Sequence, residues 1–221
     1  MFGDRHLDGA RRLAHHLQKK ALRASEQDRP DIAERRATWR AQQIGFDPHR
    51  LVFLDETWAT TNLTRLRGRA LRGERVVADA PHGHWKTSTL IAALDLRGIR
   101  CSMVLDGAVN GLAFEAFVEQ VLAPTLRAGE LVVLDNLSSH KGTRIATLIR
   151  AAGAELLYLP PYSPDLNPIE PAFSKIKQAL RSLASRTIHQ LWGSIQNVLD
   201  RVTASDAEGF FRHCGYATGI N

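Results

Sequence analysis

Cysteine is scarce in this sequence. The 221 residues include 2 cysteines, Cys101 and Cys214, which lie far apart along the chain. Two such cysteines cannot form a disulfide framework, a four-cysteine zinc site or a haem-attachment motif. We therefore expect a protein of a reducing compartment, with the cytoplasm as its location.

Long apolar runs are also lacking. Apolar runs such as 51–54 and 131–134 have four residues, whereas a membrane-spanning helix needs about 20. The sequence begins Met-Phe-Gly-Asp-Arg-His, without the apolar segment of a secretory signal. We predict no membrane contact. With 44% hydrophobic and 24% charged residues, the composition is that of a globular domain and excludes disordered and collagen-like classes.

Positive charge is unevenly distributed. The net charge is +6, and the excess lies in the first hundred residues. Five arginines fall within residues 65–75, where Glu74 is the one acid: Arg65, Arg67, Arg69, Arg72 and Arg75. Such a segment is typical of a surface that meets phosphate, and equally of a solvated, arginine-rich hairpin. Charge alone leaves both interpretations open.

The order of predicted elements indicates an α/β fold. Helical spacing predicts mostly polar helices over 7–24 and 30–43, which we assign to an N-terminal extension, residues 1–46. A domain over 47–221 follows, with C-terminal helices from about 187. We expect strands at 51–56, 75–79, 88–96, 100–105, 131–135 and 156–159. We expect helices at 112–126, 143–152, 168–183 and 188–202, then a helix opened by a capping box of Ser205 and Glu208. Strands first and then β-α-β-α alternation predict a mixed sheet with helices on its faces.

Two aspartates end apolar strands. Asp55 follows 51–54 and Asp135 follows 131–134. Ligands of open α/β sheets gather at the carboxyl ends of strands, so the two carboxylates meet there if these strands are neighbours. Buried carboxylates repel each other, and a divalent cation such as Mg²⁺ between them would offset the repulsion. Taken singly, each aspartate is better interpreted as a turn former or a helix cap that follows a strand.

A third acid lies at the end of a proline-rich segment, Leu-Pro-Pro-Tyr-Ser-Pro-Asp-Leu-Asn-Pro-Ile-Glu at 159–170. Asn167 is a good N-cap, Pro168 suits a first helical position, and Glu170 stands where a capping-box glutamate would be. Taken alone, this segment therefore predicts capping by Glu170. Asp165 is a competing candidate for the site.

Three motifs together resemble a known family. Leu-Asp-Glu-Thr at 54–57, Leu-Asp-Asn-Leu-Ser-Ser-His at 134–140 and the proline-rich segment resemble the DDE catalytic domain of insertion-sequence transposases related to mariner elements, the insertion sequence 630 group. The 34 residues between Asp135 and Glu170 match the spacing of that group. The resemblance is strong over about 51–181 and looser to about 216.

The resemblance implies a ribonuclease-H-like fold with a five-stranded sheet and a metal-binding triad of Asp55, Asp135 and Glu170. It implies two Mg²⁺ ions, with Mn²⁺ as a substitute, that support DNA cleavage by water and then strand transfer by the freed 3′-hydroxyl into a TA target. The expected partners are double-stranded DNA and a second copy of the chain. Expected DNA contacts are Arg65, Arg67, Arg69, Arg72, Arg75, Lys86, His140, Lys175 and Lys177.

Other groups of residues are weaker candidates for a functional site. Ser138 or Ser139 with His140 and Asp135 resembles a hydrolase triad, but no nucleophile-elbow glycine pattern surrounds it. His82 and His84 have no cysteine nearby and are interpreted as a polar loop. Period-two alternation places Glu56 on the face of its strand opposite to Asp55, which argues against a ligand role. Trp58 and Trp85 fit either stacking on exposed bases or ordinary packing.

The sequence departs from the family pattern at its front. Relatives carry helix-turn-helix modules ahead of the first catalytic aspartate, whereas 54 residues precede Asp55 here. These fit the second frame of a two-frame element, with an upstream helix-turn-helix product as partner, or a truncated copy. Two alternative functions therefore stay open: a non-catalytic DNA-binding or dimerising regulator, and a stand-alone nuclease of the same fold.

Overall fold

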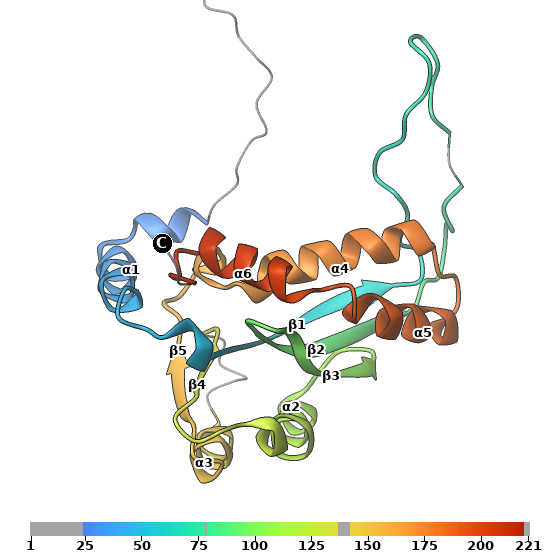
Figure 1. The fold of residues 1–221 in the computed structure, drawn as a ribbon. Coiled ribbons are helices and arrows are strands. Elements are labelled where there is room, and N and C mark those ends of the chain that lie inside the picture. Colours follow the sequence, from blue (N-terminus) through green and yellow to red (C-terminus); the bar gives the residue numbers. More distant parts are fainter. Residues whose placement is uncertain (1–23, 78, 137–141, 219–221) are drawn as a thin grey trace, which may run out of the picture.

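Five strands form one mixed sheet in the order β3-β2-β1-β4-β5 (Figure 1). The computed structural model describes residues 24–77, 79–136 and 142–218. The strands β1, β2 and β3 pair antiparallel, whereas β4 pairs parallel to both β1 and β5. This confirms the predicted mixed sheet with an antiparallel opening. The strands are β1 (Leu51–Thr60), β2 (Thr87–Asp95), β3 (Gly98–Asp106), β4 (Leu131–Leu134) and β5 (Glu155–Tyr158).

Helices cover both faces of the sheet (Figure 1). One face carries α4, α5 and α6 together with α1, and the other carries α2 and α3. Short 3-10 turns at Ser25–Asp28, Pro48–Arg50 and Pro164–Leu166 connect the elements. The helices are α1 (Pro30–Gln43), α2 (Gly111–Phe117), α3 (Thr143–Ala151), α4 (Ile169–Leu183), α5 (Ile188–Leu199) and α6 (Ala204–His213). No helix in the described ranges is both long and apolar enough to cross a bilayer.

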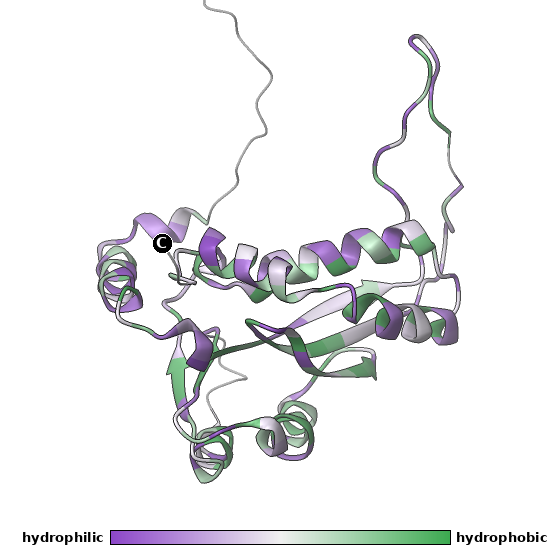
Figure 2. Ribbon diagram, in the orientation of Figure 1, coloured by the Kyte–Doolittle hydropathy of each residue, from purple (hydrophilic) through white to green (hydrophobic). Residues whose placement is uncertain are grey.

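The alternation of side chains along β1 divides the core in two. Phe53 packs toward α4, α5 and α6, and its ring meets those of Phe211 and Tyr216 edge-on, with centroids 5.3 and 5.1 Å away. Val52 and Leu54 point to the other face, toward α2 and α3. Both faces of β1 are therefore buried, as expected of a central strand. Apolar residues accordingly run along the strands, while the helices carry polar residues as well (Figure 2).

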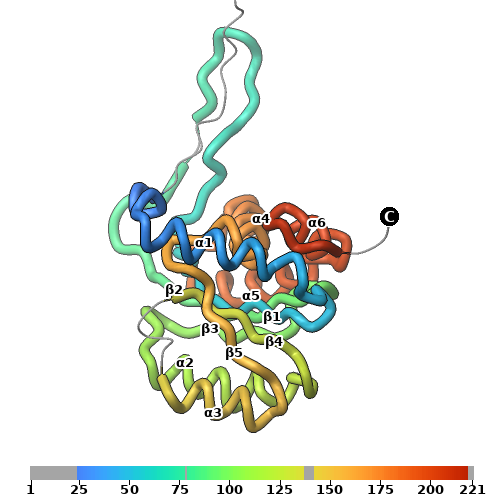
Figure 3. The backbone as a smooth tube through the Cα atoms, turned by 90° about the vertical axis from the view of Figure 1, so that its left-hand side faces the viewer, coloured from blue at the N-terminus to red at the C-terminus, as the bar shows by residue number. Residues whose placement is uncertain are grey.

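A long excursion separates β1 from β2, and we call residues 62–86 the arm. It projects from the body of the molecule in two perpendicular views (Figures 1 and 3). Its base is closed where Lys86 O accepts from Thr61 N at 3.0 Å. The strand expected at 75–79 is wrong, because the described residues of the arm contain no strand. The arm lies outside the sheet, none of the described strands pairs with it, and apolar residues such as Leu66 (78% exposed) stay outside the core.

Two helix predictions need correction in detail. The expected helix at 112–126 is present, but only α2 is α-helical; a π turn (Val118–Leu122) and a 3-10 turn (Ala123–Thr125) follow it. Pro124 lacks the N–H that a regular α turn would use there. The capping box of the last helix is formed by Thr203 and Asp206, not by Ser205 and Glu208. Both pairs have the required spacing, and the earlier pair is the one that starts the helix.

The N-terminal segment docks onto the helical layer formed by α4, α5 and α6. The expected helix at 30–43 is confirmed as α1, whereas the expected helix at 7–24 lies outside the described residues except for its last position. Trp39 Nε1 donates to Tyr216 Oη at 3.2 Å, and Gln43 Nε2 donates to Cys214 O at 2.7 Å. The side view shows α1 running across the front of the molecule (Figure 3). The start of the described chain is thereby fixed against its end.

Candidate active site

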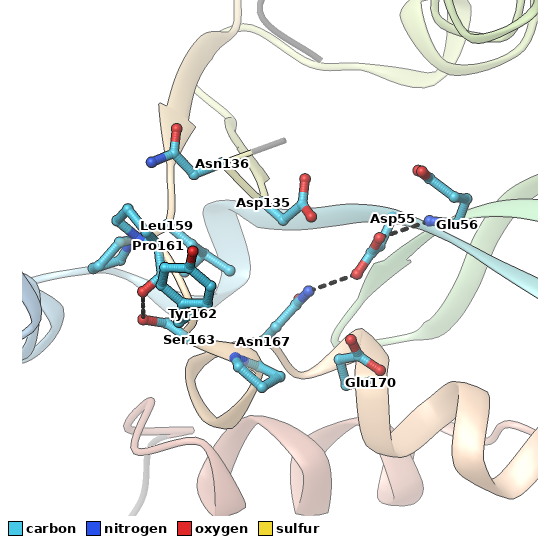
Figure 4. A pocket seen from close by; sticks show the side chains of 12 residues that line it. Asp55, Glu56, Asp135, Asn136, Leu159, Pro161, Tyr162, Ser163, Asn167 and Glu170 are labelled. Carbon is cyan, nitrogen blue, oxygen red and sulfur yellow. Dashed lines mark hydrogen bonds between the residues drawn. The ribbon is translucent and has the colours of Figure 1, made fainter. Parts of the chain in front are cut away.

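The pairing of β1 with β4 brings two aspartates to one edge of the sheet. These parallel strands are in register from Leu51 with Leu131 through Leu54 with Leu134, so Asp55 and Asp135 each follow the last pair by one residue. Phe53 and Val133, two positions earlier, pack toward α4. By alternation both aspartates face that same side. The first turn of α4 presents Glu170 to the same space (Figure 4).

The three acids line one pocket of about 540 Å³. Its wall is completed by Glu56, Asn136 and the proline-rich segment from Leu159 to Pro164, together with Asn167. Within the described part of the chain, no three His, Cys, Asp or Glu side chains approach closely enough to hold a single ion together. The acids therefore share a pocket without converging on one point.

Asp55 is the buried acid of the group, with 7% of its surface exposed. Its Oδ1 accepts from Glu56 N at 2.7 Å, and its Oδ2 accepts from Asn167 Nδ2 at 2.9 Å. Burial, followed by the negative charges of Asp135 and Glu170, raises the pKa of Asp55 to about 8. The position is thus strained electrostatically, as is typical of functional carboxylates.

Glu170 lies between a repelling acid and an attracting base. Burial raises the pKa of Glu170, the Lys177 ammonium opposes this, and Asp135 adds to it. Burial also lowers the pKa of Lys177, against the opposing pull of Glu170. Lys177 lies over the Trp58 ring at 4.6 Å from its centroid, and Trp58 is 60% exposed. Trp58 therefore packs under a lysine at the surface instead of in the core.

The proline-rich segment does not use its polar residues as caps. The side chain of Asn167 bonds to Asp55, and α4 begins without a side-chain cap. Glu170 N donates to the backbone oxygen of Asn167 at 3.1 Å, while the Glu170 carboxylate lines the pocket. The capping prediction is wrong for these residues. Asp165, the competing acid, accepts from Arg36 and does not line the pocket.

Arg36 of α1 holds the proline-rich segment, a role that the sequence did not suggest. The guanidinium is largely buried and donates to Ser163 Oγ at 2.7 Å and to both oxygens of Asp165 at 2.9 and 2.7 Å. A further bond, from Arg36 to Tyr162 O, measures 3.4 Å. The helical spacing of α1 shows only that Arg36 shares a face with Ile32 and Trp39, which is a weak signal.

Glu56 lies beside the site. Its cross-strand partner is Ile91, which packs on the α2 and α3 side. The alternation prediction is consistent with this register. Glu56 nevertheless lines the pocket, because the pocket opens where β1 leaves the sheet pairing with β4.

The expected DNA contacts fall in three places. Lys177 is next to Glu170, whereas Lys175 forms an ion pair with Asp206 of α6 and does not line the pocket. His140, with Ser138 and Ser139, lies outside the described residues. The remaining contacts are exposed residues of the arm: Arg65, Arg67, Arg69, Arg72, Arg75 and Lys86.

A groove of about 450 Å³ joins the arm to α4. Arg65 and Arg67 line it from the arm, and Arg181 lines it from α4 together with Gln178. Arg181 could not be predicted as part of this groove, because nothing in the linear order of the sequence places it beside the arm. His82 and His84 are exposed and belong to no metal-binding group among the described residues.

Comparison with known proteins decides the family. The model of a family described as DDE superfamily endonuclease matches residues 50–191. This chain belongs to the DDE superfamily endonucleases. The family match includes Asp55, Asp135 and Glu170 and confirms the resemblance that the three motifs carry.

Similar proteins of the DDE superfamily are transposases. The chain is 27% identical over 105 residues to the Transposable element Tcb2 transposase of Caenorhabditis briggsae, which covers 46% of this chain and 38% of that protein. The Mos1 mariner paired end complex with Mn has a TM-score of 0.68 at 18% identity, covering 91% of this chain and 63% of that chain. The Mos1 catalytic domain has a TM-score of 0.60 at 16% identity, covering 89% and 91%. The fold is therefore ribonuclease-H-like, and the chain spans only part of the full-length relatives.

Proposed function

We propose that this chain is the catalytic part of a DDE transposase, which cuts DNA at the ends of a mobile element and joins the freed ends to target DNA. The observation that carries the proposal is the pocket shared by Asp55, Asp135 and Glu170 in a DDE superfamily endonuclease. The Tcb2 relative is a transposase, and one similar Mos1 structure is a Strand Transfer Complex. Both support the same activity here.

The donor set of the pocket fits a hard divalent cation. Asp55, Asp135 and Glu170 offer carboxylate oxygens, the ligands that Mg²⁺ and Mn²⁺ favour. The acids raise the pKa of Asp55 by mutual repulsion, which a cation would relieve. Mos1 complexes exist with Mn and with Mg. When bound, two such ions would supply the charge that activates an attacking oxygen and stabilises the leaving one.

The surrounding cations of the chain would position DNA. Lys177 stands beside Glu170, where its ammonium can approach a phosphate of the strand to be cut. Arg65, Arg67 and Arg181 line the groove between the arm and α4, and they suit the DNA backbone on the same side of the molecule. Contacts to phosphate fix the register of a duplex and carry no sequence information.

The resemblance to mariner-related transposases suggests the assembly. We infer a TA dinucleotide as target and a homodimer that holds two element ends. Recognition of those ends would come from helix-turn-helix modules, supplied by an upstream reading frame. The Mos1 complexes with paired ends support an assembly of this kind.

A nicking assay tests the proposal. The purified chain is incubated with plasmid DNA that carries the element ends, in Mg²⁺, Mn²⁺ or EDTA. We expect nicking that requires the metal and that is lost in Glu170→Gln, whereas Glu208→Gln, an exposed change on α6, retains it. Binding of DNA without any nicking would support the regulator instead. Nicking that is never followed by joining of the freed 3′ ends to target DNA would support the stand-alone nuclease.

A further inference from the structure

Asn167 occupies an unusual place for a residue at the start of a helix. It is 3% exposed, and its Nδ2 donates to Asp55 Oδ2 at 2.9 Å, as Figure 4 shows. Its Oδ1 is buried and has no hydrogen-bond partner among the described residues. Buried amides normally satisfy both ends, and an unsatisfied end calls for an explanation. The amide is therefore committed to Asp55 at one end and open to a water or a hydrated cation at the other.

The orientation of this amide is determined by its partner. When Asp55 is ionised, as a cation ligand must be, the opposite orientation would set the Asn167 oxygen against a carboxylate oxygen, which is repulsive because neither atom can donate. Asp55 accepts one bond at each oxygen, from Asn167 and from the backbone of Glu56. The two donors come from different elements, so the carboxylate cannot turn without losing one of them.

The backbone that carries Asn167 is anchored from both ends of the described chain. Arg36 of α1 holds Ser163 and Asp165, and Leu166 O accepts from Tyr216 Oη at 2.8 Å. These contacts fix the segment immediately before Asn167. A rigid support of this kind is what keeps a second-layer residue at its ligand.

We propose that Asn167 is a positioning residue, whose side-chain N–H holds the Asp55 carboxylate in the orientation in which it lines the pocket with Asp135 and Glu170. The inference deepens the proposed function and rests on it for the identity of the reaction. Two donors leave lone pairs of Asp55 available, since an ionised carboxylate offers about four acceptor sites. Asn167 thereby supports a ligand of the cation without contacting the reacting DNA.

Two substitutions separate this role from capping of α4. Asp caps helices about as well as Asn, but Asn167→Asp removes the N–H donor and adds a charge facing Asp55. Asn167→Ala removes the donor without adding charge. Asn110 gives a matched control, because its side chain caps α2 by accepting from Ala113 N at 2.9 Å. Asn110→Asp should therefore behave as the unchanged chain.

Three measurements are made on the full chain: the Mn²⁺ concentration that half-saturates the rise in melting temperature, the nicking rate at saturating Mn²⁺, and DNA affinity in EDTA. We expect Asn167→Ala to raise the Mn²⁺ midpoint about tenfold or more, and both Asn167 variants to slow nicking about 10- to 100-fold, in the range measured for supporting residues of metal sites. DNA affinity stays unchanged. If Asn167→Ala does not fold, Asn167→Ser replaces it, because a serine hydroxyl is too short to span the same gap.

Two results would overturn the inference. One is a nicking rate of Asn167→Asp equal to that of the unchanged chain, which would mean that the Asn167 N–H is not needed to hold Asp55. The other is an unaltered Mn²⁺ midpoint in Asn167→Ala or its serine replacement. A chain that binds Mn²⁺ but nicks no DNA would instead contradict the proposed function, and the Mn²⁺ midpoints would still decide the role of Asn167.

Discussion

Asp55 shows how a functional carboxyl costs stability where it stands. Burial and two neighbouring acids raise the pKa of Asp55, so its ionised form is disfavoured in the folded chain. The hydrogen bonds from Glu56 N and Asn167 Nδ2 offset part of this cost. Packing alone would favour an apolar side chain at this position, so the carboxylate of Asp55 points to a binding role.

The first prediction concerns Asp135. Asp135→Asn removes one of the negative charges that face Asp55, so without divalent ions the free energy of unfolding at neutral pH should rise by about 1 kcal/mol. In Mg²⁺ or Mn²⁺ the same variant should not nick DNA, because a proposed ligand is lost. Urea unfolding in EDTA and the plasmid assay measure the two effects. Nicking at the unchanged rate would remove Asp135 from the proposed triad.

Single residues differed in how far the sequence could predict their roles. Asp55 and Asp135 could be singled out only as a pair within the family motifs, because an acid directly after an apolar strand, taken alone, fits a turn or a helix cap. Asn167 was assigned to capping, since local spacing suggests a cap and cannot show that Asp55 lies within reach. The docking of Arg36 on Asp165 depends on contacts 129 positions apart, for which one sequence carries no signal.

At the scale of elements, α1 is a structural support of the site. It contributes Trp39 and Ile32 to buried positions and bonds to the proline-rich segment through Arg36. The mostly polar composition of α1 suggested that it belongs to an extension. The helix instead packs against the layer formed by α4, α5 and α6. The few buried residues of α1 carry that contact.

The second prediction tests this support. Arg36→Ala removes the bonds to Ser163 and Asp165 and leaves the Asp165 carboxylate without this partner, so we expect a loss of about 2 to 3 kcal/mol in the free energy of unfolding. The neighbouring Arg35→Ala is the control, because Arg35 is exposed and should change stability by less than about 0.5 kcal/mol. Urea unfolding measures both. Equal effects of the two substitutions would show that α1 is not held through Arg36.

The third prediction concerns a buried ion network between strands. Arg100 of β3 donates to Asp95 Oδ2 at 2.8 Å and to Glu130 at 2.7 and 2.6 Å, and the three side chains are 6%, 7% and 7% exposed. Burial acts to raise the pKa of both acids. For Asp95 the hydrogen bonds from Arg97 and Arg100 outweigh burial, and for Glu130 those from Arg100 and the Arg127 backbone do, so both pKa values are lowered.

The pH dependence follows from the sign of these shifts. A lowered pKa in the folded chain contributes stability above the usual values of 3.8 and 4.5, and that stability is lost as the pH falls through the folded values. Glu130→Gln should lower the free energy of unfolding at neutral pH, and its difference from the unchanged chain should shrink below about pH 4.5. Urea unfolding across this range measures the difference. A constant difference at all pH values would contradict the network.

Elements were predictable where local pattern and tertiary contacts agree. The strand β4 and the first four residues of β1 are apolar runs that are fully buried, and α4 and α5 follow helical spacing. The strand expected near Val76 failed, since an apolar pair can lie exposed in the arm when no neighbour pairs with it. The π turn after α2 could not be predicted either, because the spacing of apolar residues was compared only with the period of an α-helix.

At the scale of the whole molecule, helix α4 lines both the groove beside the arm and the pocket. Arg65 and Arg67 of the arm meet Arg181 of α4 across a groove, and α4 also carries Glu170. The arginines of the arm are thereby gathered with Arg181 at the end of α4 opposite to Glu170. Phosphate contacts there would be independent of the base sequence.

The last prediction separates DNA positioning from DNA recognition. The chain alone should bind duplex DNA with little preference for element ends over random sequence, because the described arm offers charge and no helix or strand to enter a groove. Affinity should fall steeply with salt, with a log–log slope of about −0.9 for each phosphate contact.

Reversing the charge of Arg67 and Arg69 should weaken binding equally for all sequences and reduce that slope. The control variant carries reversed charges at Arg150 and Arg201, which are exposed on α3 and after α5. This variant should leave the DNA affinity and the salt slope unchanged. Fluorescence anisotropy measures the affinity of each variant for end and scrambled duplexes at two salt concentrations. A strong preference for the ends that persists at high salt would show that residues 1–46 contain a recognition module and are more than a support for the catalytic domain.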